Sequence, residues 1–125
     1  MKLSDFCRPA LCALAVSAAA LAVASTAYAH ARPTVLEPAP NAEVAAPSQL
    51  TIHFSEPLEA SFSKIAVSDA SDKAATAEAA QVDAHDSKTI HVALQPLTPG
   101  RYTVKWTAVA TDGHRTQGTY AFTVK

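Results

Sequence analysis

The chain has 125 residues, with 10 lysines and arginines against 11 aspartates and glutamates, and its formal net charge is −1. This near-neutral balance excludes the basic stripe typical of proteins that bind nucleic acid or an anionic membrane surface. Both cysteines, Cys7 and Cys12, and the single methionine, Met1, lie near the start, so the rest of the chain lacks the sulfur ligands of zinc-finger, iron–sulfur and blue-copper sites.

Residues 1–29 are predicted to be a secretory signal peptide. Lys2 and Arg8 give a positive start, residues 10–24 form a mostly apolar run of 15 residues, and Ala27-Tyr28-Ala29 has the small-residue pattern of a cleavage site. The run is shorter than the roughly 20 residues that a membrane-spanning helix needs. We expect cleavage after Ala29 and export of residues 30–125 to the periplasm, as one small domain.

The expected mature chain reads as a series of short strands. In residues 50–55, Leu50, Ile52 and Phe54 would face inward while the intervening residues face outward. The alanine-rich residues 74–82 favour helix by propensity but carry no stripe of large apolar side chains, so we interpret them as a weak strand. Six or seven strands are predicted, in chain order residues 35–36, 50–55, 63–69, 74–82, 89–94, 102–107 and 118–124.

Turns rich in proline, glycine, asparagine and aspartate separate these strands, and no helical pattern is convincing. The segment Leu97-Thr98-Pro99-Gly100-Arg101-Tyr102 is similar to the tyrosine corner of immunoglobulin-like sandwiches. The predicted fold is therefore all-β, a small antiparallel Greek-key β-sandwich or barrel of the immunoglobulin-like type. Its expected core consists of Ile52, Phe54, Ile65, Val67, Ile90, Val92, Tyr102, Val104, Trp106, Tyr120 and Phe122.

The candidate site joins His30 to Asp112-Gly113-His114. Cleavage after Ala29 would give His30 a free α-amine beside its imidazole. On an extended backbone Asp112 and His114 face the same side, and Gly113 lets the backbone bend close to an ion. Three nitrogens and one carboxylate suit Cu(II), which heads the affinity series for such ligands. Taken singly, each piece could be an ordinary turn or a chance first residue; the conjunction favours a metal site.

For the other polar residues, the sequence gives weaker evidence of a role at the metal site. Glu56, at the end of a predicted core strand, could hydrogen-bond the terminal amine or a ligand imidazole, or could simply be solvated. His53 and His91 fall on outward strand positions, and we interpret both as surface histidines. His85 lies in a loop with Asp83 and Asp86, where a loop role is favoured over metal binding.

The order and spacing of several segments together resemble the CopC family of periplasmic copper-binding proteins. The resemblance rests on His30, Phe54-Ser55-Glu56-Pro57-Leu58, the segment from Leu97 to Tyr102, Trp106, Thr111-Asp112-Gly113-His114, Gly118 and Phe122-Thr123-Val124. It implies a cupredoxin-like or immunoglobulin-like sandwich that binds one Cu(II) through His30, Asp112 and His114, with Glu56 nearby. It also implies a soluble copper carrier, expected to be monomeric, that acts with a CopD-type inner-membrane partner in copper tolerance or uptake.

One departure from the family pattern is informative. Some relatives carry a methionine-rich segment for Cu(I), whereas residues 59–84 contain no methionine here. Soft Cu(I) would lack its preferred ligands, so we expect one Cu(II) site and no methionine-based Cu(I) site. Two alternatives stay open: a copper monooxygenase with a histidine brace, which is less favoured because Asp112 would close the site, and a metal-free adhesion-type sandwich.

Overall fold

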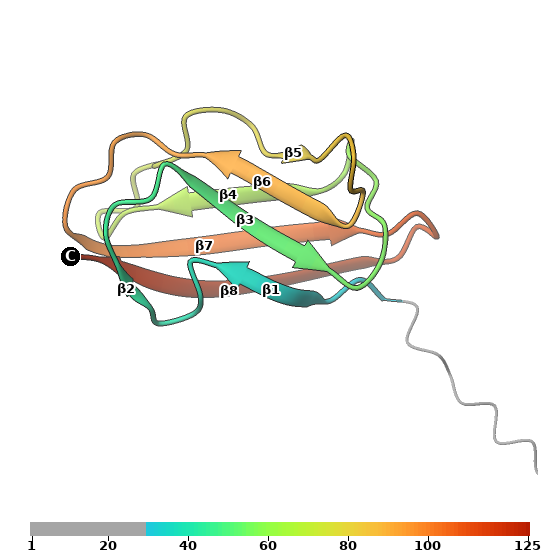
Figure 1. The fold of residues 1–125 in the computed structure, drawn as a ribbon, viewed down its shortest axis with the longest axis horizontal. Helices are drawn as coiled ribbons and strands as arrows, with labels where there is room; N and C mark the ends of the chain where they lie inside the picture. The colour runs from blue at the N-terminus through green and yellow to red at the C-terminus, as the bar shows by residue number, and fades with distance from the viewer. Residues whose placement is uncertain (1–29) are drawn as a thin grey trace, which may run out of the picture.

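A computed structural model describes residues 30–125, and the predicted signal peptide lies outside the described residues. The chain forms two four-stranded sheets packed face to face (Figure 1), ordered β1-β3-β6-β5 and β2-β8-β7-β4. The strands are β1 (Pro33–Glu37), β2 (Glu43–Val44), β3 (Gln49–Phe54), β4 (Lys64–Ser68), β5 (Gln81–Val82), β6 (Thr89–Ala93), β7 (Gly100–Val109) and β8 (Arg115–Val124). Within residues 30–125 there is no helix of a length and apolarity that could span a bilayer. The predicted β-sandwich is confirmed.

One strand pair departs from the antiparallel arrangement, since β2, at a position where no strand was predicted, runs parallel to β8. After β1 the chain crosses to the second sheet, where the Asn41 N–H donates to the Ala121 carbonyl at 2.7 Å. It then follows β8 toward the C-terminus, so its two paired residues, Glu43 and Val44, run in the same direction as β8.

Strand lengths differ most from the prediction in the second sheet. The strands predicted at 102–107 and 118–124 are parts of a long hairpin, in which β7 and β8 have 10 residues each. The first residues of β8, from Arg115 to Gln117, are all polar, so no apolar alternation indicated that the strand begins there. The strand predicted at 74–82 is largely absent, because only Gln81–Val82 pairs as a strand and Ala74 and Thr76 make isolated bridges.

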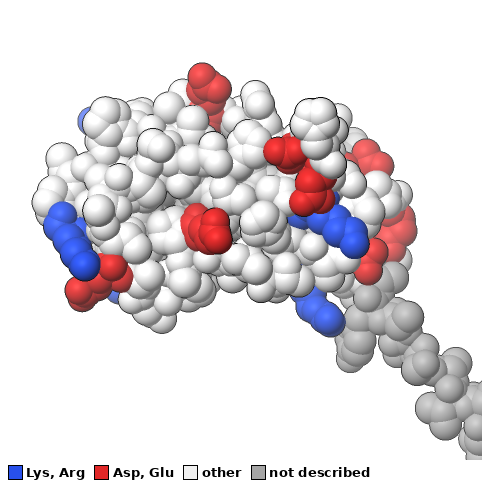
Figure 2. Space-filling model, viewed as in Figure 1, with Lys and Arg blue, Asp and Glu red and all other residues white. Residues whose placement is uncertain are grey.

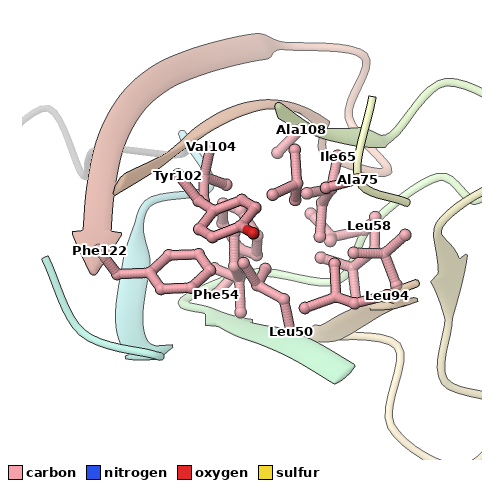
Figure 3. Packing of buried hydrophobic residues seen from close by; sticks show 14 of the residues in the cluster. Leu50, Phe54, Leu58, Ile65, Ala75, Leu94, Tyr102, Val104, Ala108 and Phe122 are labelled. Atoms are coloured by element: carbon pink, nitrogen blue, oxygen red, sulfur yellow. The ribbon is translucent and has the colours of Figure 1, made fainter. Parts of the chain in front are cut away.

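The core lies between the sheets, where the Tyr102 and Phe122 rings stack with centroids 5.6 Å apart (Figure 3). Nine of the eleven predicted core residues are buried; Trp106 and Tyr120 are instead half-buried and pack against the core. Burial raises the pKa of the Tyr120 hydroxyl to about 12. Eight buried apolar residues lie outside the expected core, four of them alanines: Ala31, Leu50, Leu58, Ala75, Leu94, Ala108, Ala110 and Val124.

The tyrosine corner is confirmed. The Tyr102 hydroxyl donates to the Thr98 carbonyl at 2.7 Å and accepts from the Thr98 N–H at 3.1 Å. Both bonds close the turn that leads into β7, because the ring is buried and its hydroxyl reaches back to the backbone at the corner. The corner therefore fixes where the long β7–β8 hairpin begins.

Gly118 makes room for the indole ring of Trp106, its partner across the hairpin. A Cβ at position 118 would lie 2.5 Å from Cζ2 of Trp106, whose ring also packs edge-on against Phe54. We expect Gly118→Ala to lower the free energy of unfolding by about 1–3 kcal/mol, because a rigid ring must shift in a packed interior. Urea denaturation would measure this, with Thr119→Ala as the exposed control; an unchanged midpoint for Gly118→Ala would contradict the packing account.

Candidate metal centre

Four segments meet at one end of the sandwich, on the right of Figure 1: residues 30–32, residues 55–59 after β3, the loop 83–88 and the turn 110–114 between β7 and β8. Backbone hydrogen bonds join them. The Leu58 N–H donates to the Ser87 carbonyl at 2.8 Å, and the Thr111 N–H donates to the Pro57 carbonyl at 3.2 Å. The segment after β3 therefore bridges the two loops.

The turn between β7 and β8 holds Asp112 and His114 together. The Ala110 N–H donates to the His114 carbonyl at 2.9 Å, and the Gly113 N–H donates to the Ala110 carbonyl at 2.8 Å. Gly113 has a φ of 88°, a conformation that glycine adopts without a Cβ clash. The prediction that the two side chains share one side is right, but a turn rather than an extended backbone brings them together.

Asp112 and His114 are joined by two hydrogen bonds. Nδ1 of His114 lies 3.0 Å from Oδ2 of Asp112, and the His114 backbone N–H donates to Oδ1 at 3.0 Å. The hydrogen bond from the His114 ring, then the one from its backbone, lowers the pKa of the Asp112 carboxyl below its usual range. Because a carboxylate can only accept, Nδ1 of His114 carries a proton, and in the neutral form of the ring Nε2 then holds the free lone pair.

The amino-terminal segment is fixed against this turn. Ala31 is fully buried, and its carbonyl accepts a hydrogen bond from the Thr116 hydroxyl at 2.8 Å. Ser55 binds on the other side: its N–H donates to the Arg32 carbonyl at 2.9 Å, and its hydroxyl accepts from the Arg32 N–H at 3.1 Å. The His30 ring consequently meets the His114 ring edge-on, with centroids 4.8 Å apart.

Ser55 and Thr116 are site residues that the sequence did not reveal. Neither is a metal-binding side chain: Ser55 directly follows β3, and Thr116 occupies a polar position in β8, and both positions fit any sandwich. Their role follows only from partners far away in the chain, with Thr116 bonded to a residue 85 positions earlier. No local pattern could have signalled such a contact.

Removing the Thr116 hydroxyl is expected to loosen the first residues without unfolding the domain. In Thr116→Val the shape is kept, while the buried Ala31 carbonyl loses its partner. If His30 binds copper, affinity for Cu(II) should fall roughly 10-fold, as is usual when a residue that orients a ligand is removed. Competition titration would measure the change against Thr119→Val on the same strand, and equal affinities for the two variants would contradict this positioning role.

Glu56 lies half-buried in the segment after β3. The carbonyl of the next residue, Pro57, accepts a hydrogen bond from the Thr111 N–H in the turn 110–114, so Glu56 belongs to the same end of the molecule. Its contact with the terminal amine or with an imidazole stays a prediction.

The other histidines differ in their surroundings. His85 is exposed in its loop, and His91 is half-buried on β6. His53 is more than a plain surface residue: its Nδ1 lies 2.8 Å from the Thr89 hydroxyl, which donates to Asp86 at 2.6 Å. This Thr89 bond lowers the pKa of the Asp86 carboxyl. The network closes the loop 83–88 beside the candidate site.

Within residues 30–125, no three His, Cys, Asp or Glu side chains converge on a common point. The predicted ligands instead form two pairs that share His114: His114 with Asp112, and His114 with His30. In the uncut chain the nitrogen of His30 is an amide, which cannot serve as an amine ligand. The described geometry therefore fits a metal only if the His30 nitrogen is freed.

Acidic side chains collect at this end of the molecule (Figure 2). The four segments carry five carboxylates and two cations, namely Glu56, Glu59, Asp83, Asp86 and Asp112 against Arg32 and Lys88. This excess of negative charge raises the local concentration of cations around the paired histidines.

The fold and the site define a small β-sandwich protein with paired histidines and a carboxylate at one end. Residues 34–125 match the family model described as the CopC domain, and the chain belongs to the CopC family. YobA of Escherichia coli K12 is 40% identical over 115 residues, which cover 90% of this chain and 92% of that protein.

Two further comparisons agree. Copper resistance protein C of Pseudomonas syringae pv. tomato is 35% identical over 114 residues, covering 86% of this chain and 90% of that protein. The crystal structure of PcoC, a methionine-rich copper resistance protein from Escherichia coli, matches with a TM-score of 0.70 at 33% identity, and the match covers 78% of this chain and 100% of PcoC.

Proposed function

We propose that this protein is a periplasmic copper carrier or buffer that holds one Cu(II) ion at its amino-terminal end. Membership in a family that includes copper resistance proteins supports the choice of metal. The observation that carries the proposal is the contact between His30 and His114. Their ring centroids lie 4.8 Å apart, although the two residues are near opposite ends of the described chain. The ligands would be the amine and imidazole of His30, with Asp112 and His114.

The chemistry of these donors suits Cu(II). Nε2 of His114 keeps its lone pair because Nδ1 donates to Asp112, and each Asp112 oxygen can accept a further bond. His30 would supply two nitrogens that close a chelate ring on one ion. Nitrogen-rich sites with one carboxylate favour the tetragonal geometry of Cu(II). A methionine-based Cu(I) site is not proposed, since the only methionine is Met1, in contrast to the methionine-rich PcoC.

The cellular role follows from the same proposal. The predicted signal peptide would place residues 30–125 in the periplasm, as a monomer without a catalytic function of its own. Copper would then be exchanged with another protein, and a CopD-type inner-membrane protein is the partner that the family resemblance suggests. Intact mass of the exported protein would test the processing step, and a start at any residue other than His30 would contradict it.

An enzyme is the alternative that a specific observation favours. Two histidine rings, one of them at the expected amino terminus, also make up a histidine brace, which activates oxygen in copper monooxygenases. Asp112 beside His114 argues for a closed carrier site instead. Incubating the copper-loaded protein with a reductant, oxygen and polysaccharides would decide, because sustained oxidative turnover would establish the enzyme.

Titration of residues 30–125 with Cu(II) tests the proposal directly, and the proposed ligands imply that Cu(II) affinity falls as the pH is lowered. We expect one ion per chain, with affinity falling between about pH 8 and about pH 5, where free amines and imidazoles in general take up protons. The lowered pKa of Asp112 keeps its carboxylate charged across this range, so the nitrogen ligands set the loss. Affinity independent of pH would contradict the ligand set, and absence of Cu(II) binding would favour a metal-free sandwich.

A further inference from the structure

The two sheets differ in the charge of their outer faces. The strands of β1-β3-β6-β5 contain a single charged residue, Glu37, and the middle of the face seen in Figure 2 shows an acidic group and no basic one. The opposite sheet carries one acid, Glu43, on its short edge strand. All the basic residues within strands lie on this opposite sheet and are exposed, and the next residue of each strand is buried or half-buried, so they point outward: Lys64, Arg101, Lys105 and Arg115.

A hollow of about 190 Å³ lies on this basic face near the candidate metal centre. It is lined by Ser61, Phe62, Lys64, Thr107, Val109 and Arg115. Phe62 is 63% exposed and, with Val35, is one of two large apolar side chains exposed in the described part of the chain. The hollow thus combines an aromatic ring and an arginine, residue types that are enriched at protein interfaces, with a second cation, Lys64.

Phe62 is held outward by the turn that contains it. The Glu59 N–H donates to the Val109 carbonyl at 2.7 Å, and the Phe62 N–H donates to the Glu59 carbonyl at 3.2 Å. The next residue, Ser63, is buried, and its hydroxyl accepts from the Val109 N–H at 3.2 Å. Because the turn is fixed on both sides, the ring cannot fold into the core without breaking these bonds.

The two cations beside Phe62 have no acidic partner among residues 30–125, where the recorded ion pair joins His114 to Asp112. Their charge is therefore available to a partner. Arg115 directly follows His114, and Val109 directly precedes Ala110, whose N–H is bonded to the His114 carbonyl. Two residues that line the hollow therefore flank the turn that presents Asp112 and His114.

We propose that the hollow around Phe62 is the docking site of an acidic partner protein that exchanges copper with this chain. The complementary segment would place one apolar side chain against Phe62 and carboxylates against Lys64 and Arg115. A hollow that accepts a single side chain favours a protein over a flat anionic membrane. Its small size fits a weak, transient contact, as transfer of a cargo requires. This inference rests on the proposed copper-carrier function.

Copper transfer to a synthetic acceptor tests the docking site. The acceptor is a peptide with its own amino-terminal copper site and one leucine among four glutamates, and its neutral counterpart has glutamines. The Cu(II)-loaded protein should give copper to the acidic peptide at least about five-fold faster at low salt, because opposite charges speed encounter. The advantage should vanish in concentrated salt and in Phe62→Ser and Lys64→Glu, but persist in Arg101→Glu at the far end of the face.

The outcomes separate the docking site from the copper site. Amide shifts in NMR spectra on adding the acidic peptide should centre on residues 62–64, 109 and 115. Equal transfer rates to both peptides, unchanged rates in Phe62→Ser and Lys64→Glu, or shifts centred elsewhere would overturn the docking site. Vesicles of anionic lipid that bind the same residues and block transfer would assign the face to a membrane and also overturn it. Cu(II) titration of every variant is the control, since failure of the parent to bind Cu(II) would contradict the carrier function instead.

Discussion

Adding one glycine before His30 in the mature protein is expected to weaken Cu(II) binding by more than about 100-fold, beyond the usual effect of losing a residue that merely orients a ligand. The added residue moves the free amine about 3.8 Å along the chain and turns the His30 nitrogen into an amide. Ala31 is buried and bonded to Thr116, so the chain cannot slide back to restore the chelate. Competition against a chelator of known affinity would measure the loss.

Two controls make this result specific to the amine. Acetylation of the His30 amine removes the lone pair without lengthening the chain and should cause a comparable loss. A glycine added after Lys125 should change nothing. If the extended protein held Cu(II) as tightly as the parent, the amine would be removed from the ligand set, whereas a lowered melting temperature would point to damage to the fold.

Removal of the His114 or Asp112 side chain is the second large effect that we expect. His114→Ala deletes the proposed imidazole ligand, which is also the ring that meets His30, so Cu(II) affinity should fall by more than about 100-fold. Asp112→Ala deletes the carboxylate and also releases Nδ1 of His114 from its hydrogen bond. Both side chains are well exposed, at 40% for Asp112 and 57% for His114, so the fold should survive either change.

Electron paramagnetic resonance of the Cu(II) forms would distinguish the two roles, because the loss of His114 reduces the number of nitrogen ligands while the loss of Asp112 does not. His85→Ala and His91→Ala serve as matched controls that should bind copper as the parent does. Unchanged affinity in both His114→Ala and Asp112→Ala would end the proposed ligand assignment. Thermal unfolding of each variant would check that the sandwich remains folded.

The fold was predictable because period-two alternation records which face of a strand is buried. Residues 50–55 and 63–69 alternate large apolar and polar side chains, and the structure places strands there. Residues 74–82 carry alanines whose small side chains give no such contrast, and the strand predicted there was mostly absent. The parallel pairing of β2 escaped prediction because two residues cannot record a direction.

The candidate ligands were predictable for a different reason. Histidine next to a cleavage motif and Asp112-Gly113-His114 are chemically distinctive wherever they occur. The residues that position these ligands are not distinctive in the sequence. Thr116 and Ser55 act through a single backbone carbonyl and a single backbone N–H group, which any polar residue of similar size could contact. The hydrogen bond between His53 and Thr89 likewise depends on strand register, which the sequence of either strand alone does not define.

Because Ala31 is buried, the position of the first residue relative to the folded domain is fixed by where the chain starts. If the chain is cleaved after Ala29 as proposed, a single residue, His30, precedes the buried Ala31, so a start displaced by one position would change the terminus and leave the sandwich intact. A preparation with mixed amino termini would show a single unfolding transition, although some of its molecules would bind Cu(II) and others would not. A melting temperature therefore does not show whether a preparation can bind copper at the proposed site, whereas an accurate mass shows whether the chain begins at His30.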